Sequence, residues 1–166
     1  TFIYRISSLS RAEEVGANVY PALADLSGSV AAYRIYGALF FGAVKLIEDL
    51  QDHLPRQALV LDLKNVIYID SSGIDTLNDL ARACQKSGVH LIISGLINQT
   101  LDIAQRSGFI QRVGLTQVHN HLANAIAQAL TLIHVNAPLP EMTEPDTDGS
   151  AQMPTESDLD LSSRQE

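Results

Sequence analysis

The sequence predicts an α/β domain built around a small mixed β-sheet, largely parallel, with an antiparallel hairpin at one edge. Short runs of branched apolar residues alternate along the chain with segments in which apolar residues recur at helical spacing. A Ser-Gly pair follows two successive helical segments, at 87–88 and 107–108, where the chain must turn back toward a sheet. Strands separated by single helices need right-handed crossovers and therefore lie parallel. We expect about four helices.

The first expected element is the hairpin at the edge of the sheet. Ser10 with Glu13 predicts a cap for a short helical turn near the amino terminus. After it, weak apolar alternation over 20–26 and a second apolar run over 30–36 flank the turn Ser27-Gly28-Ser29. This pattern predicts two antiparallel strands joined by that turn.

A helix is expected over 43–53, with an apolar face that includes Val44 and Ile47 and a stop at Pro55. Phe40 and Phe41 directly precede it. We expect at least one of these two phenylalanines in the core, and the alternative is that they form an apolar surface that docks against a partner.

The centre of the chain is a buried strand over 59–69 that leads into a helix through Asp70-Ser71-Ser72-Gly73. Ser72 with Asp75 three residues on predicts a capping pair for this helix. Two hydroxyls would then lie at a helix N-terminus, where free N–H groups and the helix dipole favour added negative charge. Ser71 and Ser72 are therefore candidate regulatory residues, while Asp70, Gly73 and Asp75 position the loop. Capping alone is the other interpretation of these residues.

The later elements repeat the alternation of strand and helix. A buried strand is expected over 89–94, and Asn98 is expected to cap a helix that ends at 107–108. A short strand over 115–118 and a final helix over 120–134 complete the domain. Cys84 falls on the apolar stripe of the central helix, and we expect an inert core residue there.

Charge divides the 166-residue chain into two parts. The net charge is −8, of which −7 lies in residues 141–166, so the remainder is nearly neutral. No basic cluster of the kind that binds nucleic acid occurs. The tail, 138–166, combines acids, Ser, Thr and Pro with few large apolar groups, and we expect it to be disordered. The chain begins with Thr1 and lacks a run of about 18 apolar residues, which indicates a soluble piece of a longer protein.

Enzyme chemistry is not expected from this sequence. Ser71 has Asp70 beside it, but no G-x-S-x-G elbow occurs and adjacent residues rarely make a base contact. The five histidines show no metal-ligand spacing, with His119 and His121 alone a weak pair. No phosphate-binding G-x-x-x-x-G-K-[ST] loop occurs, and we expect no metal and no cofactor.

The segment I-D-S-S-G-I at 69–74, between a buried strand and a helix, resembles the signature of STAS domains. These modules occur in SulP-type anion transporters and in bacterial anti-sigma-factor antagonists. The segment 33–42 (YRIYGALFFG) is similar to the G-P-L-F-F segment of the transporter branch, with Ala38 where proline is usual, and Ser94-Gly95-Leu96 adds support. The resemblance covers about residues 29–134. Within SulP transporters, the stretch looks most similar to cyanobacterial sodium-dependent bicarbonate transporters.

The resemblance implies a STAS fold, with helices mainly on one face of the sheet, and a role in regulation and dimerisation. Residues 1–17 would connect a preceding membrane domain to the STAS domain at 18–137. The partners would be that transmembrane domain, a second copy in a homodimer, and a regulatory protein or kinase, at the cytoplasmic face of the inner membrane. The alternative is a free anti-sigma-factor antagonist, in which the serine after the aspartate, here Ser71, is phosphorylated.

Overall fold

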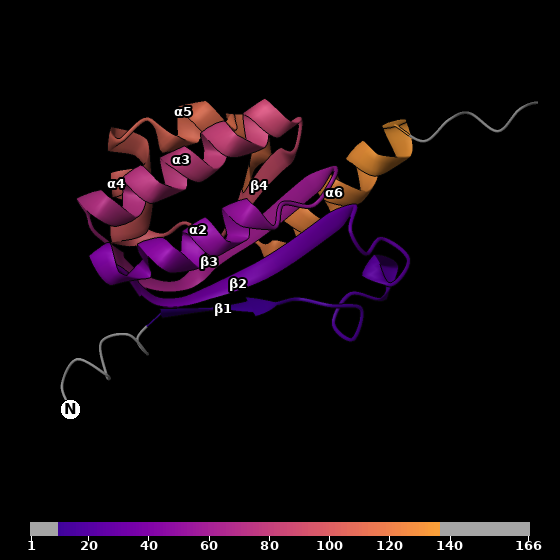
Figure 1. Cartoon of the computed structure of the whole chain (residues 1–166), viewed down its shortest axis with the longest axis horizontal. Coiled ribbons are helices and arrows are strands. Elements are labelled where there is room, and N and C mark those ends of the chain that lie inside the picture. Colours follow the sequence, from indigo (N-terminus) through magenta and orange to yellow (C-terminus); the bar gives the residue numbers. More distant parts are fainter. Residues whose placement is uncertain (1–9, 137–166) are drawn as a thin grey trace, which may run out of the picture.

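The computed structural model describes residues 10–136, which contain one five-stranded sheet (Figure 1). The strands lie side by side in chain order, with β1 antiparallel to β2 and every other neighbouring pair parallel. Their bounds are β1 (Ser10–Glu14), β2 (Val30–Leu39), β3 (Ala58–Ile69), β4 (His90–Ser94) and β5 (Val118–His119). The predicted mixed sheet with one antiparallel edge is confirmed.

Five α-helices and three short 3-10 helices connect the strands of this part of the chain. The α-helices are α2 (Val44–Asp52), α3 (Ser71–Ser87), α4 (Asn98–Arg106), α5 (Phe109–Val113) and α6 (Leu122–Asn136). The 3-10 helices are η1 (Pro21–Leu23), η2 (Phe41–Ala43) and η3 (Leu115–Gln117). Among residues 10–136, no helix combines the length and apolar character that crossing a membrane requires.

The sheet separates two hydrophobic cores, and β3 contributes to both because successive strand residues point to opposite faces. Leu59, Leu61 and Leu63 join the larger core, which is covered by α2, α3, α4 and α5. Ala58 and Val60 join the smaller core, in which α6 provides the cover. Four helices on one face and one on the other confirm the expected layering. Both cores are aliphatic, with Phe109 the only fully buried aromatic side chain among the largest buried residues.

The edge hairpin was predicted in the wrong segment. The antiparallel partner of β2 is β1, in which Ala12 pairs with Ile35 while Arg11 and Glu13 are exposed. Residues 20–26 instead contain η1, since Pro21 has no N–H to donate to a sheet and favours the first turn of a helix. The helical turn expected from Ser10 and Glu13 is also wrong, because pairing with β2 outweighs their capping pattern.

The segment after β4 also differs from the expectation. The residue at the N-cap of α4 is Ile97, whose backbone N–H and carbonyl both bond the hydroxyl of Thr100. Asn98 is the first helical residue rather than the cap, with a positive φ of 51°. Gly108 ends α4 as expected, but the chain then forms α5, which packs the fully buried ring of Phe109 into the core. A five-residue helix is too short to show a reliable sequence period.

The proposed domain limits fall partly outside the described residues. Residues 1–9 of the predicted connector and the whole predicted tail, 138–166, lie outside them. Within them, Cys84 is buried on α3, which confirms the prediction of a core position. Burial raises the pKa of its thiol to about 11, so the reactive thiolate is disfavoured.

Candidate functional site

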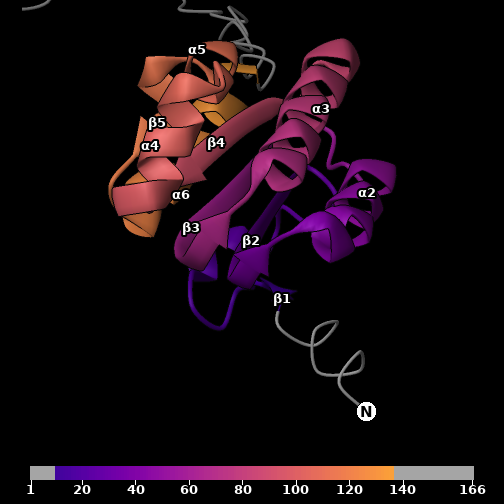
Figure 2. The same cartoon turned by 90° about the vertical axis from the view of Figure 1, so that its left-hand side faces the viewer.

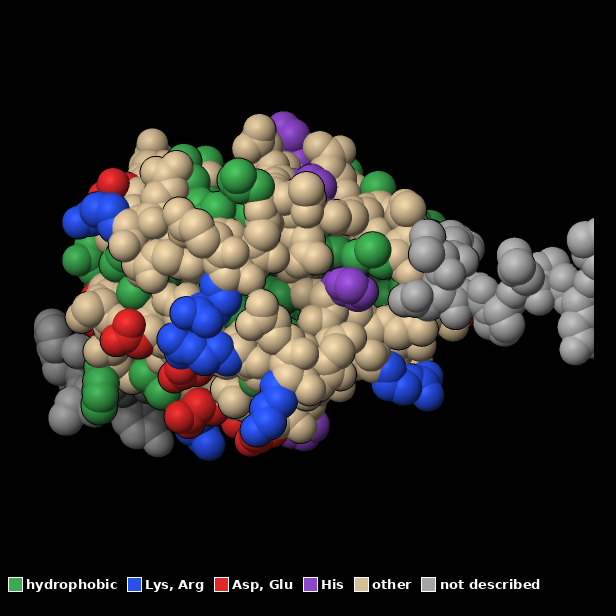
Figure 3. All heavy atoms as spheres, turned by 90° about the horizontal axis from the view of Figure 1, so that it is seen from above, with side chains coloured by type: hydrophobic (Ala, Val, Ile, Leu, Met, Phe, Trp, Pro, Cys, Tyr) green, Lys and Arg blue, Asp and Glu red, His purple; other side chains and the backbone are tan. Residues whose placement is uncertain are grey.

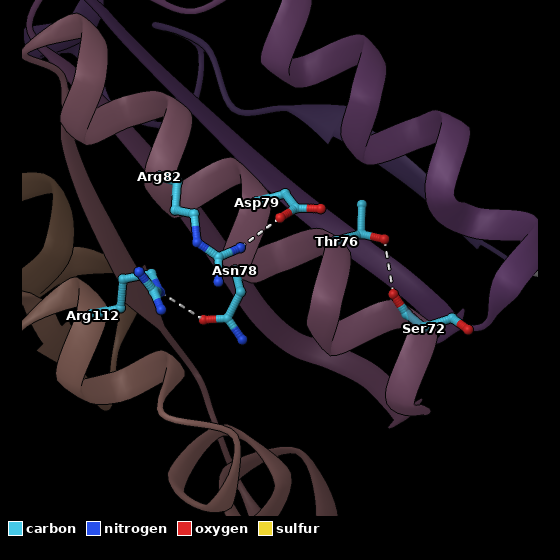
Figure 4. Close-up of polar contacts among 6 residues, drawn as sticks. All are labelled: Ser72, Thr76, Asn78, Asp79, Arg82 and Arg112. Atoms are coloured by element: carbon cyan, nitrogen blue, oxygen red, sulfur yellow. Dashed lines mark hydrogen bonds and ion pairs between the residues drawn. The ribbon is translucent and has the colours of Figure 1, made fainter.

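The candidate site lies where β3 ends and α3 begins, at the carboxyl ends of the parallel strands. This end of the sheet faces the viewer in Figure 2. Ser71 and Ser72 are the first two residues of α3, so the predicted position at a helix start is confirmed. Ser71 is exposed and Ser72 is half-buried. The hydroxyl of Thr76 donates to the carbonyl of Ser72 at 2.8 Å, one turn into the helix (Figure 4).

The cap of α3 is Asp70, and the predicted pair of Ser72 and Asp75 is wrong. Asp70 has an extended backbone, and its Oδ1 accepts a hydrogen bond from the N–H of Gly73 at 2.7 Å. A carboxylate is a strong N-cap because it satisfies a free N–H and complements the positive end of the helix, together about 1 kcal/mol. Asp75 is exposed on the first turn. Because the Asp70 carboxylate is used as the cap, it is poorly placed to act as a base.

Gly73 is required because the start of α3 touches the end of β2. A Cβ atom at this position would collide with the carbonyl oxygen of Leu39 and lie 3.0 Å from the Leu39 Cβ. The same carbonyl accepts a hydrogen bond from the N–H of Asp70 at 3.1 Å. The carbonyl of Leu39 therefore contacts the loop at both Asp70 and Gly73, and the loop presents the Ser71 hydroxyl from a fixed base.

At its carboxyl end, β3 pairs with β2 on one side, and a side chain from α4 binds it on the other. The amide of Gln99 accepts from the N–H of Ile69 at 3.0 Å and donates to the carbonyl of Ile69 at 2.8 Å. This pair replaces the strand neighbour that β3 lacks here, since β4 pairs only with residues 58–62. Ile69, two residues before Ser71, is thus held by β2 on one side and by Gln99 on the other.

Phe40 and Phe41 are exposed, so the expectation that at least one lies in the core is wrong. The preceding residue, Leu39, takes the core position, while the side chain of Phe41 is 80% exposed. The ring of Phe40 lies 5.6 Å from that of Tyr68, centre to centre. Together with Ile67, Tyr68 and Ile97, these side chains form what we call the apolar rim, at the carboxyl ends of β2, β3 and β4. Figure 3 shows hydrophobic side chains reaching the surface along this edge of the molecule.

A row of polar residues crosses the sheet, and sequence reasoning missed it. The pairing register aligns one residue from each strand at the same level: Glu13, Arg34, Asp62, Ser94 and His119. Directly paired residues project to the same face, and Asp62 follows Val60, which packs under α6. The Nε2 atom of His119 also lies 2.5 Å from the Oε1 atom of Gln128 on α6. The row therefore bounds the smaller core.

Asp62 is the buried charged member of this row, with a side chain only 5% exposed. Its Oδ2 lies 3.4 Å from the Nε of Arg34, close enough for an ion pair although hydrogen-bond geometry is not reached. Its Oδ1 accepts from the hydroxyl of Ser94 and from the N–H of Lys64, each at 3.2 Å. Gly95, with a φ of 77°, leaves room for this group, because a Cβ there would lie 2.7 Å from the same oxygen. In the sequence, the acidic residue inside the apolar run LVLDL was the available signal that Asp62 is a buried charge.

Two polar contacts on α3 point away from the candidate serines (Figure 4). The buried Asn78 accepts from the Nε of Arg112 at 3.2 Å, which ties α5 to α3. On the exposed side, Arg82 and Asp79 form an ion pair at 2.6 Å. Neither contact bears on the chemistry at Ser71, and exposed pairs of this kind contribute little to stability.

Comparison with known proteins identifies the family to which this fold belongs. Residues 22–128 match the family model of the STAS domain. The chain is 27% identical over 125 residues to the putative sulfate transporter YvdB of Bacillus subtilis, a match that covers 72% of this chain and 24% of that protein. The chain thus spans about a quarter of the length of that curated relative.

Solved structures give the same fold. A sulfate transporter family protein from Wolinella succinogenes is 29% identical, with a TM-score of 0.59 and coverage of 64% of this chain and 88% of that one. The anti-sigma factor antagonist SpoIIAA in its unphosphorylated form is 16% identical, with a TM-score of 0.52 and coverage of 62% and 90%. The likeness to SpoIIAA is of fold alone.

Proposed function

The chain belongs to the STAS domain family, and we propose on this premise that it is the regulatory and dimerisation domain of a SulP-type anion transporter. The observation that carries the proposal is the match to part of a putative sulfate transporter, of which the chain covers 24%. In this proposal a transmembrane domain of the same protein is the main partner. The domain would lie at the cytoplasmic face of the inner membrane and form a homodimer.

Bicarbonate is the anion that we propose for the complete protein. The support is the overall likeness of the stretch around 33–42 and 69–74 to cyanobacterial sodium-dependent bicarbonate transporters. The anion itself would bind in the membrane domain, so residues 10–136 would act on its transport by contact. Uptake of labelled bicarbonate and of labelled sulfate by the full-length protein in vesicles tests the choice, since a preference for sulfate would overturn it.

We propose that the domain acts through the surface around Asp70 and Ser71 and performs no catalysis. The exposed Ser71 hydroxyl stands at the first position of a 17-residue helix. The loop before it is hydrogen-bonded to Leu39, which the exposed Phe40 and Phe41 follow directly in the chain. The N–H groups at this end of α3 would stabilise added negative charge, including that of a phosphate group. Phe40 and Phe41 would supply apolar contact area next to this polar group.

Replacing Ser71 by glutamate tests this surface. A negative charge in the first turn complements the helix dipole by about 0.3–1 kcal/mol, so Ser71→Glu should leave the melting temperature close to that of the wild type. In the full-length protein it should weaken dimerisation or change the transport rate. Ser87→Glu is the matched control, because it puts the same charge on an exposed serine at the other end of α3. Unchanged dimerisation and transport in Ser71→Glu would remove the loop from the proposed interface.

The second candidate function is that of a free anti-sigma-factor antagonist, and the exposed position of Ser71 after Asp70 favours it. Co-expression with serine kinases from the same organism, followed by intact-mass measurement, separates the two. Stoichiometric phosphate that is lost in Ser71→Ala would support the antagonist. A protein that carries no phosphate but alters transport when Ser71 is changed would support the transporter domain.

A further inference from the structure

The apolar rim concentrates the exposed hydrophobic surface of the described residues at one end of the sheet. Seven large hydrophobic side chains are exposed among residues 10–136. Five of them form the rim, and Val19 and Leu115 are the two that lie elsewhere. Single exposed hydrophobic residues are common on protein surfaces, whereas a group of them at one edge indicates that something covers it.

The chain enters the described structure beside this rim. Ser10, the first residue of β1, pairs with Gly37, and β1 runs antiparallel to β2. Ser10 therefore lies near the end of β2 that leads to Leu39 and Phe40. Figures 1 and 2 show β1 starting at the end of the sheet where β2 and β3 finish and α3 begins. Nine residues can span up to about 30 Å, so the whole rim is within their reach.

The composition of residues 1–9, TFIYRISSL, suits this surface. Five of the nine side chains are large and apolar, and Arg5 is the single charged one. Removing such side chains from water against exposed aromatic rings is favourable. Because the segment is tethered directly to β1, its effective concentration at the rim is on the order of millimolar or more, well above that of a separate partner.

We propose that residues 1–9 of this chain cover the apolar rim, packing their hydrophobic side chains against Phe40, Phe41 and Tyr68. The inference concerns residues of this chain alone and does not depend on the proposed attachment to a transporter.

The chain has no tryptophan, so one introduced tryptophan reports on its own surroundings. Phe41→Trp places the reporter on the rim, and Leu115→Trp is the matched control, since the two native side chains are 80% and 79% exposed. Each reporter is combined with Phe2→Ser and Ile6→Ser in the complete 166-residue chain, which removes apolar groups and leaves β1 intact. The readouts are the emission maximum and quenching by iodide.

With the native segment, the tryptophan at position 41 should emit at shorter wavelength and show about half the quenching constant that it shows with the two serines. The tryptophan at position 115 should give the same values in both backgrounds. Equal quenching at position 41 in both backgrounds would overturn the proposal. Protection at position 41 that rises with protein concentration would also overturn it, in favour of a second copy as the cover. Neither result would alter the proposed transporter role, which rests on the match to part of a putative sulfate transporter.

Discussion

Replacing Arg34 by methionine should lower the free energy of unfolding by about 2–3 kcal/mol, a large effect for one substitution at the sheet surface. The Asp62 carboxylate would remain buried with its hydrogen bonds from Ser94 and Lys64 but without a positive partner. Removing one member of a fully buried pair costs about 3–5 kcal/mol, and the partial exposure of Arg34 reduces the expected value. Urea unfolding measures the change.

The double variant Arg34→Met with Asp62→Leu is the matched control for this prediction. It removes both charges and fills the site with apolar groups of similar size, so it should recover most of the lost stability. The reason is that the uncompensated carboxylate, and not the missing attraction, accounts for the cost. A double variant no more stable than Arg34→Met alone would show that the hydrogen bonds that Asp62 accepts from Ser94 and Lys64 matter more than its uncompensated charge.

Gly73→Ala should destabilise the domain by about 2 kcal/mol, although alanine is the better helix former. Alanine gains about 1 kcal/mol of helix propensity over glycine. Against this gain stands the collision of its Cβ with the Leu39 carbonyl, and overpacking of this kind costs about 1–3 kcal/mol or more when the neighbour is backbone. The loop would separate from β2 and weaken the hydrogen bond between Asp70 and Leu39.

Thermal unfolding followed by circular dichroism tests this prediction, with Ser71→Ala as the control. Ser71 is exposed in the same turn, so its replacement should change stability by less than about 0.5 kcal/mol. A Gly73→Ala protein as stable as the wild type would mean that α3 can move away from β2 without cost. The loop would then be an adaptable surface and not the rigid one described above.

The centre of the fold could be predicted because each of its segments shows a single, unambiguous burial pattern. The run Leu59–Leu63 is buried on both faces, so nearly every residue is apolar, and a parallel central strand follows from that. The helical period after Gly73 and the buried Cys84 follow from a single apolar stripe. For the same reason Ser71 and Ser72 could be placed at a helix start before the structure was known.

The misassigned elements are those in which two signals compete. Ser10 and Glu13 fit a helix cap and an edge strand equally well, and pairing with β2 decides the outcome. Asp70 and Ser72 are both good caps, and the backbone of Asp70 is the one that is extended. Phe40 is hydrophobic enough for the core, but the core position at the end of β2 is filled by Leu39.

The polar row could not be predicted from the sequence because it depends on register across five strands. Asp62 is separated by 28 residues from Arg34 and by 32 from Ser94, and no local pattern links them. Only the pairing of the strands brings these residues to one level. The apolar rim is likewise visible only once β2, β3 and β4 end at one edge of the sheet.

The central claim is that the start of α3 is a contact surface, and hydrogen exchange at its first amides tests it most directly. The N–H groups at a helix start lack intrahelical partners and exchange quickly unless something covers them. Exchange at residues 71–72, which precede the hydrogen-bonded N–H groups of Gly73 and Ile74, should be slower in the full-length protein than in this chain alone. Exchange along α5, which contacts α3 further along at Asn78, should be the same in both. Equal exchange at residues 71–72 in the two proteins would contradict the account.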